Sequence, residues 1–165
     1  MSSLIKRGHD AMLEHYSFSV KFIVDRGVSH EIVRHRLASF AQESTRYCNY
    51  NKAGQVAFIR PLFFKEDTPE FDNWCEAMMA AEACYLDMIQ KGKKPQEARA
   101  VLPNSLKTEI VMTANLREWR HFFNLRAVGT TGAPHPQMRE VAIPLLEELK
   151  ECIPVVFDDL IVEGV

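Results

Sequence analysis

Alternating apolar and polar residues predict the first strand of the protein. In the segment HYSFSVKFIVD, at residues 15–25, apolar side chains recur at every second position from Tyr16 to Phe22. A period of two residues is typical of a strand with one buried face. Two shorter segments, 55–60 and 106–113, are further strand candidates. The pattern therefore predicts three strands.

Helical periodicity fills the stretches between these strands, and several predicted ends carry capping residues. Ser29, Thr68 and Asn115 are each followed by a helical pattern that a Ser, Thr or Asn cap starts well. The predicted helices cover residues 29–44, 68–91, 95–103, 115–128 and 136–151. We see no internal repeat, linker or charge block, so the sequence predicts one α+β domain over residues 1–165.

Composition excludes several classes of protein. Of the 165 residues, 47% are hydrophobic and 25% are charged, which is typical of a globular chain with a real core. The formal net charge of −2 gives no global positive field for nucleic acid. No apolar run reaches the ~20 residues that span a bilayer. The first residues, MSSLIKRGHDAM, lack a signal-peptide pattern, so we expect a cytoplasmic protein.

The cysteines favour a reducing compartment. The chain has four, and none forms a C-x-x-C pair, so neither a disulfide framework nor a zinc site is expected. We predict four free thiols packed as small hydrophobic side chains.

An arginine-rich segment is the first candidate for ligand binding. On a helix over 29–44 and just beyond, hydrogen-bonding side chains would form one stripe, flanked by Arg34 and Arg36: His35, Ser39, Gln42 and Arg46. Guanidinium groups match phosphate oxygens bidentately, so this stripe could hold a phosphorylated ligand. The alternative is a solvated helix face, which spacing alone favours by about two to one.

The same segment does not support a zinc protease. His30-Glu31 begins the H-E-x-x-H pattern, but Arg34 stands where the second histidine is required. His35 lies one position further, on another side of a helix. We therefore predict no metal.

A second arginine-rich segment covers residues 115–126. Leu116, Trp119 and Phe123 form an apolar stripe that favours a core position, while Arg117 and His121 form an i, i+4 pair. Aromatic residues among arginines also occur in single-stranded nucleic-acid binders, but the net charge weighs against that function.

Single histidines and one arginine are weaker candidates. His9 and His15 lie near the first strand, where a lone histidine is more often structural than catalytic. Arg99 has apolar neighbours in the sequence and needs an anionic partner from the protein or from a ligand.

Taken together, these motifs resemble the flavin-dependent thymidylate synthases. That family's signature is Arg-His-Arg, seven residues, then Ser-x-Arg-Tyr, and here RHR at 34–36 is followed by STRY at 44–47. Three further blocks agree in order and spacing, and a fourth resembles the family's next helix: HDAMLEHYSF, EARAVLP, NLREWRHFFNLR and HPQMREVA. The resemblance extends from about residue 7 to residue 150.

The resemblance implies an enzyme. Members methylate dUMP at C5 to give dTMP, with the carbon from methylenetetrahydrofolate and the hydride from FAD that NADPH has reduced. They have a mixed α/β fold with an antiparallel sheet packed against helices. They are homotetramers with shared active sites, so dUMP and a second copy of the chain are the expected partners, with no nucleic acid and no membrane.

The resemblance also assigns roles to individual residues. Arg126 would lie at the uracil edge as the catalytic cation, favouring the ring deprotonated at N3. The residues expected to bind FAD are His9, Arg34, His35, Arg36, Gln42, Asn115, Arg117 and His121. Those expected to bind dUMP are Glu31, Arg34, Gln42, Glu43, Ser44, Thr45, Arg46, Arg99 and Arg126.

Some positions depart from the family pattern. Position 31 is commonly Gln and is Glu here, position 11 is often Thr and is Ala here, and the chain starts almost at the first block. The loop after Arg126, GTTGAPHP, is also longer than usual. The short start and Glu31 motivate the alternative of a non-catalytic relative that binds flavin or nucleotide.

Overall fold

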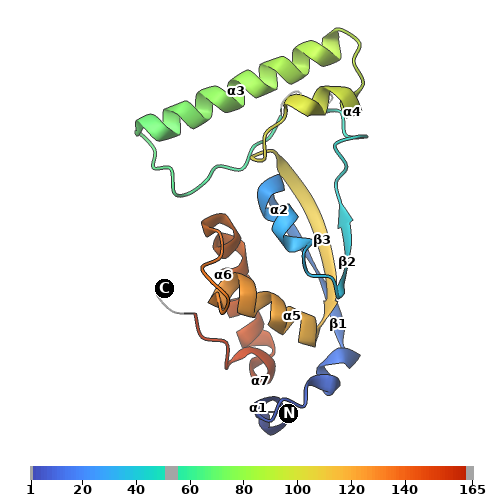
Figure 1. The fold of residues 1–165 in the computed structure, drawn as a ribbon, viewed down its shortest axis with the longest axis vertical. Helices are drawn as coiled ribbons and strands as arrows, with labels where there is room; N and C mark the ends of the chain where they lie inside the picture. Colours follow the sequence, from blue (N-terminus) through green and yellow to red (C-terminus); the bar gives the residue numbers. More distant parts are fainter. Residues whose placement is uncertain (1, 51–55, 163–165) are drawn as a thin grey trace. The chain divides into compact units, whose positions relative to one another are not determined.

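The computed structural model describes residues 2–50 and 56–162. It contains one three-stranded antiparallel sheet: β1, Ser17–Asp25; β2, Ala38–Gln42; and β3, Lys107–Asn115. The strand order is β1-β3-β2, so β3 is the central strand (Figure 1). The sheet and its helices confirm the predicted α+β class.

Hydrogen bonds at both ends fix the pairing of β1 with β3. The Leu116 N–H donates to the Tyr16 carbonyl, and the Arg26 N–H donates to the Leu106 carbonyl. Residues of β3 alternate between half-buried and buried, which is the two-residue period of a strand with one core face. The predicted strands at 15–25 and 106–113 are therefore confirmed.

The predicted helix over 29–44 is wrong. The chain instead forms α2, Arg26–Ile32, then a turn, and then strand β2. Leu37, Phe40 and Ala41 in the segment LASFAQ have helical spacing, but six residues are too few for their own pattern to decide between a helix and a strand. Pairing with the central strand β3 decides it, and the helical stripe from His35 to Arg46 does not exist.

The third predicted strand, at 55–60, is not found in the part of the segment that the structure describes. Residue 55 lies outside the described residues. Within 56–60, Phe58 makes a single isolated bridge with Leu106. Pro61 follows closely and cannot donate to a ladder, which limits the pairing to this one bridge.

The remaining helices largely follow the predicted boundaries. The Thr68 hydroxyl accepts from the Phe71 N–H, and the Asn115 side chain accepts from the Glu118 N–H at 2.9 Å, so both predicted caps are confirmed. Pro154 starts a further helix as well as ending the previous one. Besides α2, the described α-helices are α1, Ser2–Lys6; α3, Pro69–Gln90; α4, Pro95–Ala98; α5, Leu116–Phe123; α6, Pro136–Cys152; and α7, Pro154–Phe157.

The structure also describes three short turns of other helical types. They are the 3-10 turns η1, Asp10–His15, and η3, Arg99–Val101, and the π-helical turn η4, Asn124–Val128. The last one continues α5 and ends at Gly129, whose φ of 81° is in the left-handed region that glycine adopts without strain.

The chain divides into two compact units. The first unit comprises residues 1–22, 31–41 and 111–165, and the second comprises 23–30 and 42–110. In the first, Trp119 is fully buried and stacks on Phe18, with ring centroids 4.9 Å apart. In the second, Tyr85 and Leu106 belong to a separate apolar cluster. That one domain covers residues 1–165 stays a prediction.

The cysteines are free thiols, as predicted. Cys84 and Cys152 are exposed, so the prediction that all four are packed is wrong for these two. Both lie on helices with one solvent-facing side, α3 and α6.

Among the described residues, no helix combines the length and apolar character needed to cross a bilayer.

Candidate active site

A cavity of about 880 Å³ lies entirely within the first unit. Its size is within the range typical of sites for small molecules and cofactors. Six of the eight residues predicted to bind FAD line it: Arg34, His35, Arg36, Asn115, Arg117 and His121. His9 is exposed and is not part of the lining, and Gln42 belongs to the second unit.

Local structure explains why these residues converge. Arg34, His35 and Arg36 occupy the turn between α2 and β2, and the backbone N–H groups of Arg34 and His35 donate back to carbonyls of α2. Asn115, as the cap of α5, lies at the junction of β3 and that helix. Its side-chain oxygen is committed to the Glu118 N–H, so its amide NH₂ is the group left for a ligand.

The arginines of the cavity differ in what they already bind. Arg117 pairs with Glu14 of the turn η1, which packs against α5. Arg34 and Arg36 are exposed, and within the described residues their guanidinium groups make no hydrogen bond or ion pair. Two unpaired guanidinium groups at a cavity suit an anionic ligand such as a pyrophosphate.

His35 is a buried, neutral imidazole. It is 3% exposed, and burial, followed by the positive charge of Arg126 and the nearby His121, lowers its pKa from 6.5 to about 4. Arg126 Nε lies 3.2 Å from His35 Nε2, and because arginine only donates, Nε2 must accept. The proton of the neutral ring is therefore on Nδ1, which faces Glu118 Oε1 at 3.4 Å.

Glu118 is a cavity residue that sequence reasoning missed. It is 6% exposed, and burial raises the pKa of its carboxyl above the ordinary value, while His121 opposes that shift. The sequence feature that could have indicated it is its position three residues after the helix cap Asn115, in the first turn of α5. The negative charge of a carboxylate at 3.4 Å favours the Nδ1–H tautomer of His35, although the two groups form no hydrogen bond.

Ligand atoms of His35, Glu118 and His121 lie within 4.8 Å of one another. This set resembles a two-histidine, one-carboxylate metal site. However, His35 Nε2 already accepts from Arg126, and Nδ1 carries the proton, so His35 offers no free lone pair while Arg126 is in place. The arrangement does not fit a metal ion, and we assign none to it.

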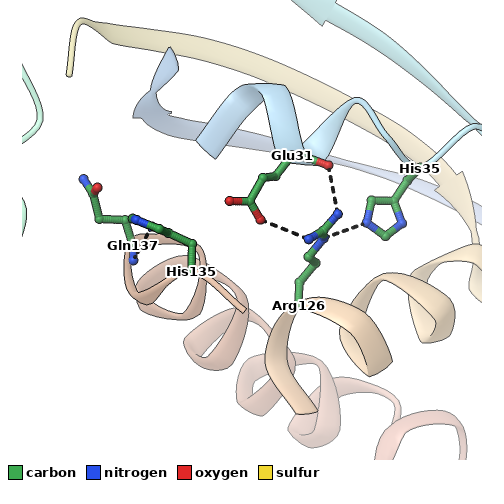
Figure 2. A network of polar contacts seen from close by, with 5 residues as sticks. All are labelled: Glu31, His35, Arg126, His135 and Gln137. Atoms are coloured by element: carbon green, nitrogen blue, oxygen red, sulfur yellow. Dashed lines mark hydrogen bonds and ion pairs between the residues drawn. The ribbon is translucent and has the colours of Figure 1, made fainter. Parts of the chain in front are cut away.

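Arg126, the predicted catalytic cation, is the centre of a polar network (Figure 2). Its Nη1 lies 3.0 Å from Glu31 Oε2, its Nη2 lies 3.4 Å from the Glu31 carbonyl, and its Nε donates to His35. Glu31 is the penultimate residue of α2, so the guanidinium also lies at the carbonyl end of that short helix. The ion pair between Glu31 and Arg126 was not predicted.

The remaining residues predicted to bind dUMP belong to the second unit. Gln42 Nε2 donates to the Ser29 hydroxyl at 2.8 Å and to the Thr108 hydroxyl at 3.3 Å. Arg99 Nη1 donates to the hydroxyl of Thr45 at 2.9 Å. Arg99 is exposed and its bonded partner is a neutral hydroxyl, so the expectation that it needs an anionic partner is not met within the described protein.

Three other residues of this group have distinct surroundings. Glu43 pairs with Lys107 at 3.7 Å. The Ser44 hydroxyl accepts from the Arg46 N–H at 3.3 Å, while the exposed Arg46 guanidinium lies over the Tyr47 ring. The predicted dUMP residues are thus divided, with Glu31, Arg34 and Arg126 in the first unit and the others in the second.

Comparison with known proteins agrees with these motifs. Residues 1–155 match the family model described as thymidylate synthase complementing protein. A flavin-dependent thymidylate synthase of Pyrococcus furiosus is 36% identical over 145 residues, covering 86% of this chain and 58% of the relative. The flavin-dependent thymidylate synthase of Thermococcus kodakarensis is 38% identical over 146 residues, with the same coverage of 86% and 58%.

A third relative is covered more completely. The flavin-dependent thymidylate synthase of Corynebacterium aurimucosum is 36% identical over 172 residues, covering 94% of this chain and 67% of the relative. The chain spans less than two thirds of the length of the Pyrococcus and Thermococcus relatives that it matches.

Proposed function

Because the chain belongs to the thymidylate synthase complementing protein family, we propose that it catalyses the reductive methylation of dUMP to dTMP. The carbon comes from methylenetetrahydrofolate, and the hydride comes from FAD that NADPH has reduced. The observation that carries this proposal is the cavity of the first unit, whose lining includes Arg34, Arg36 and Arg117 together with the neutral His35.

The cavity fits the cofactor in volume and in donors. The free guanidinium groups of Arg34 and Arg36 suit the FAD pyrophosphate, and the Asn115 amide and His121 offer further polar contacts. When bound, FAD supplies the hydride chemistry, and the protein supplies binding, orientation and electrostatics.

In this proposal the nucleotide is bound by the residues that the family resemblance indicates. Donors for the phosphate, the sugar and the uracil edge come from Arg34, Gln42, Thr45, Arg99 and Arg126. Glu43, Ser44 and Arg46 belong to the same set. A guanidinium at the uracil edge stabilises negative charge on the ring and makes C5 more nucleophilic, which is a recognised way to lower a barrier.

The assembly is also part of the proposal. We infer a homotetramer whose subunits share active sites, acting in the cytoplasm on free nucleotide. Sedimentation of the FAD-loaded protein with and without dUMP tests the tetramer.

Visible absorption of the flavin tests the function. The FAD-loaded protein is reduced with NADPH under anaerobic conditions, and dUMP and methylenetetrahydrofolate are then added separately and together. We expect the oxidised flavin bands to bleach with NADPH and to return only when both substrates are present, with one dTMP formed per flavin reoxidised.

Other outcomes contradict the proposal in different ways. Bands that bleach and stay bleached with both substrates indicate a binding relative without synthase activity. A protein that takes up no FAD removes the flavin function altogether.

A further inference from the structure

The guanidinium of Arg126 is already occupied by the protein on two sides. Of its five N–H donors, one reaches His35 Nε2, one reaches the Glu31 carboxylate and one reaches the Glu31 carbonyl. Figure 2 shows Glu31 and His35 converging on it from the same segment of chain, α2 and the turn that follows. His35 adds no positive charge of its own at Arg126, because burial lowers its pKa to about 4 and keeps the ring neutral.

The Glu31 carboxylate neutralises the charge that the proposed mechanism needs. At 3.0 Å it forms a direct ion pair with Arg126, and the two side chains are only 31% and 20% exposed. A neutral pair attracts an anionic nucleotide far less than a free guanidinium does, since the attraction depends on net charge at short range. The same carboxylate also repels a phosphate or a deprotonated uracil.

We propose that Glu31 is an internal competitor that occupies Arg126 until an anionic nucleotide replaces it, and that it thereby sets the affinity of the site. This inference rests on the proposed function, in which Arg126 contacts dUMP. Glu31 then determines how strongly the enzyme binds its nucleotide, and a glutamine at the same position removes the competition.

The local geometry allows the exchange at little structural cost. The Glu31 carbonyl also accepts from the Arg34 N–H at 3.2 Å, so it keeps a partner when Arg126 turns away. The carboxylate is partly exposed and gains water when released. Arg126 keeps its Nε contact with buried His35, so only the Nη groups need to change partners.

Glu31→Gln is the decisive variant because glutamine still offers an oxygen to Arg126 Nη1 but carries no charge. Binding of dUMP to the FAD-loaded full chain is measured by isothermal titration calorimetry. We expect Glu31→Gln to bind dUMP about tenfold more tightly than the unmodified protein. Glu66→Gln, which removes a carboxylate from the ion pair with Arg60 in the second unit, is the matched control and should change nothing.

A double variant separates competition from simple repulsion. In an Arg126→Ala background, Glu31→Gln has no arginine to release, so its effect on dUMP affinity should fall below about twofold. If Arg126→Ala is not folded by circular dichroism, Arg126→Gln takes its place. Tighter binding only in the presence of Arg126 supports the competitor role.

Three outcomes overturn it. An equal gain in both backgrounds assigns the effect to general repulsion. If Glu31→Gln binds dUMP as tightly as the unmodified protein or more weakly, and Arg126 is still required for dUMP binding, Glu31 is a positioning residue. The proposed function is not contradicted by that result. Failure of every variant and of the unmodified FAD-loaded protein to bind dUMP removes the proposed function, and the competitor role with it.

Discussion

Two arginines of the cavity in the first unit, Arg34 and Arg36, differ from Arg99 and Gln42 of the second unit in how far the protein already satisfies their polar groups. Arg34 and Arg36 have no bonded partner among the described residues. In the second unit, Arg99 is bonded to Thr45, and Gln42 to two hydroxyls. Where a side-chain charge is unpaired, a ligand supplies the missing partner. A single such residue can then account for much of the affinity of the protein for that ligand. Where a network already exists, each residue contributes less.

Arg126 differs from both groups. It is charged like Arg34, but Glu31 and His35 already occupy three of its donors. Removing Arg126 should therefore affect the chemical step more than FAD binding. Four changes test this comparison of the three groups of residues, from the largest expected effect to the smallest.

Arg126→Ala should reduce the rate of dTMP formation by about 1,000-fold or more, because it removes the cation that stabilises charge on the uracil ring. FAD should remain bound, since Arg126 is not part of the cavity lining. Chromatographic assay of dTMP, together with the flavin content of the purified variant, checks both statements. Retained turnover contradicts the catalytic role.

Arg34→Ala should weaken FAD binding by about 100-fold, because a charge-assisted and often bidentate contact is lost. Flavin fluorescence during titration of the apoprotein measures this. The matched control is Arg60→Ala, which removes an arginine paired with Glu66 outside the cavity. A variant that purifies fully loaded with flavin argues against the contact.

His35 should make the stability of the protein fall in mild acid. Its pKa of about 4 lies below the ordinary 6.5, so between these values the unfolded chain binds a proton that the folded chain does not. Its contribution is fully present above pH 6.5 and is lost as the pH falls toward 4. From pH 7 to pH 5 we expect a loss of about 2 kcal/mol.

Urea unfolding at both pH values, compared with His35→Gln, isolates this contribution. Groups that titrate in both proteins cancel, so the variant should lose about 2 kcal/mol less than the unmodified protein. Equal losses in the two proteins mean that His35 is already protonated, or is not buried, in the folded state.

Thr45→Val should weaken dUMP binding by only about fivefold, because it removes one neutral hydroxyl from Arg99 while keeping the shape of a buried side chain. FAD affinity should not change. Thr113→Val, which breaks a hydroxyl pair with Ser19 in the first unit, serves as the control. An effect as large as that of Arg34→Ala would erase the distinction between the two regions.

Local sequence signals predicted some parts of the fold well for identifiable reasons. Thr68 and Asn115 are caps whose side chains bond within their own helix, so no distant partner is needed to place them. The alternation of 15–25 is long enough to specify a strand by itself. The segment from Leu37 to Gln42 is too short for that, and its pairing with β3, about seventy positions away in the sequence, converted a predicted helix into β2.

The sequence by itself determined the α+β class, most of the helix ends, the family and six of the residues that line the cavity, because these depend on local chemistry and on a long motif. Only the tertiary structure decided which partners those residues have. It placed Glu31 against Arg126 and Glu118 against His35, across separations of 95 and 83 positions along the chain. Charge, tautomer and pKa follow from such contacts, and folding alone brings residues so distant in sequence close together.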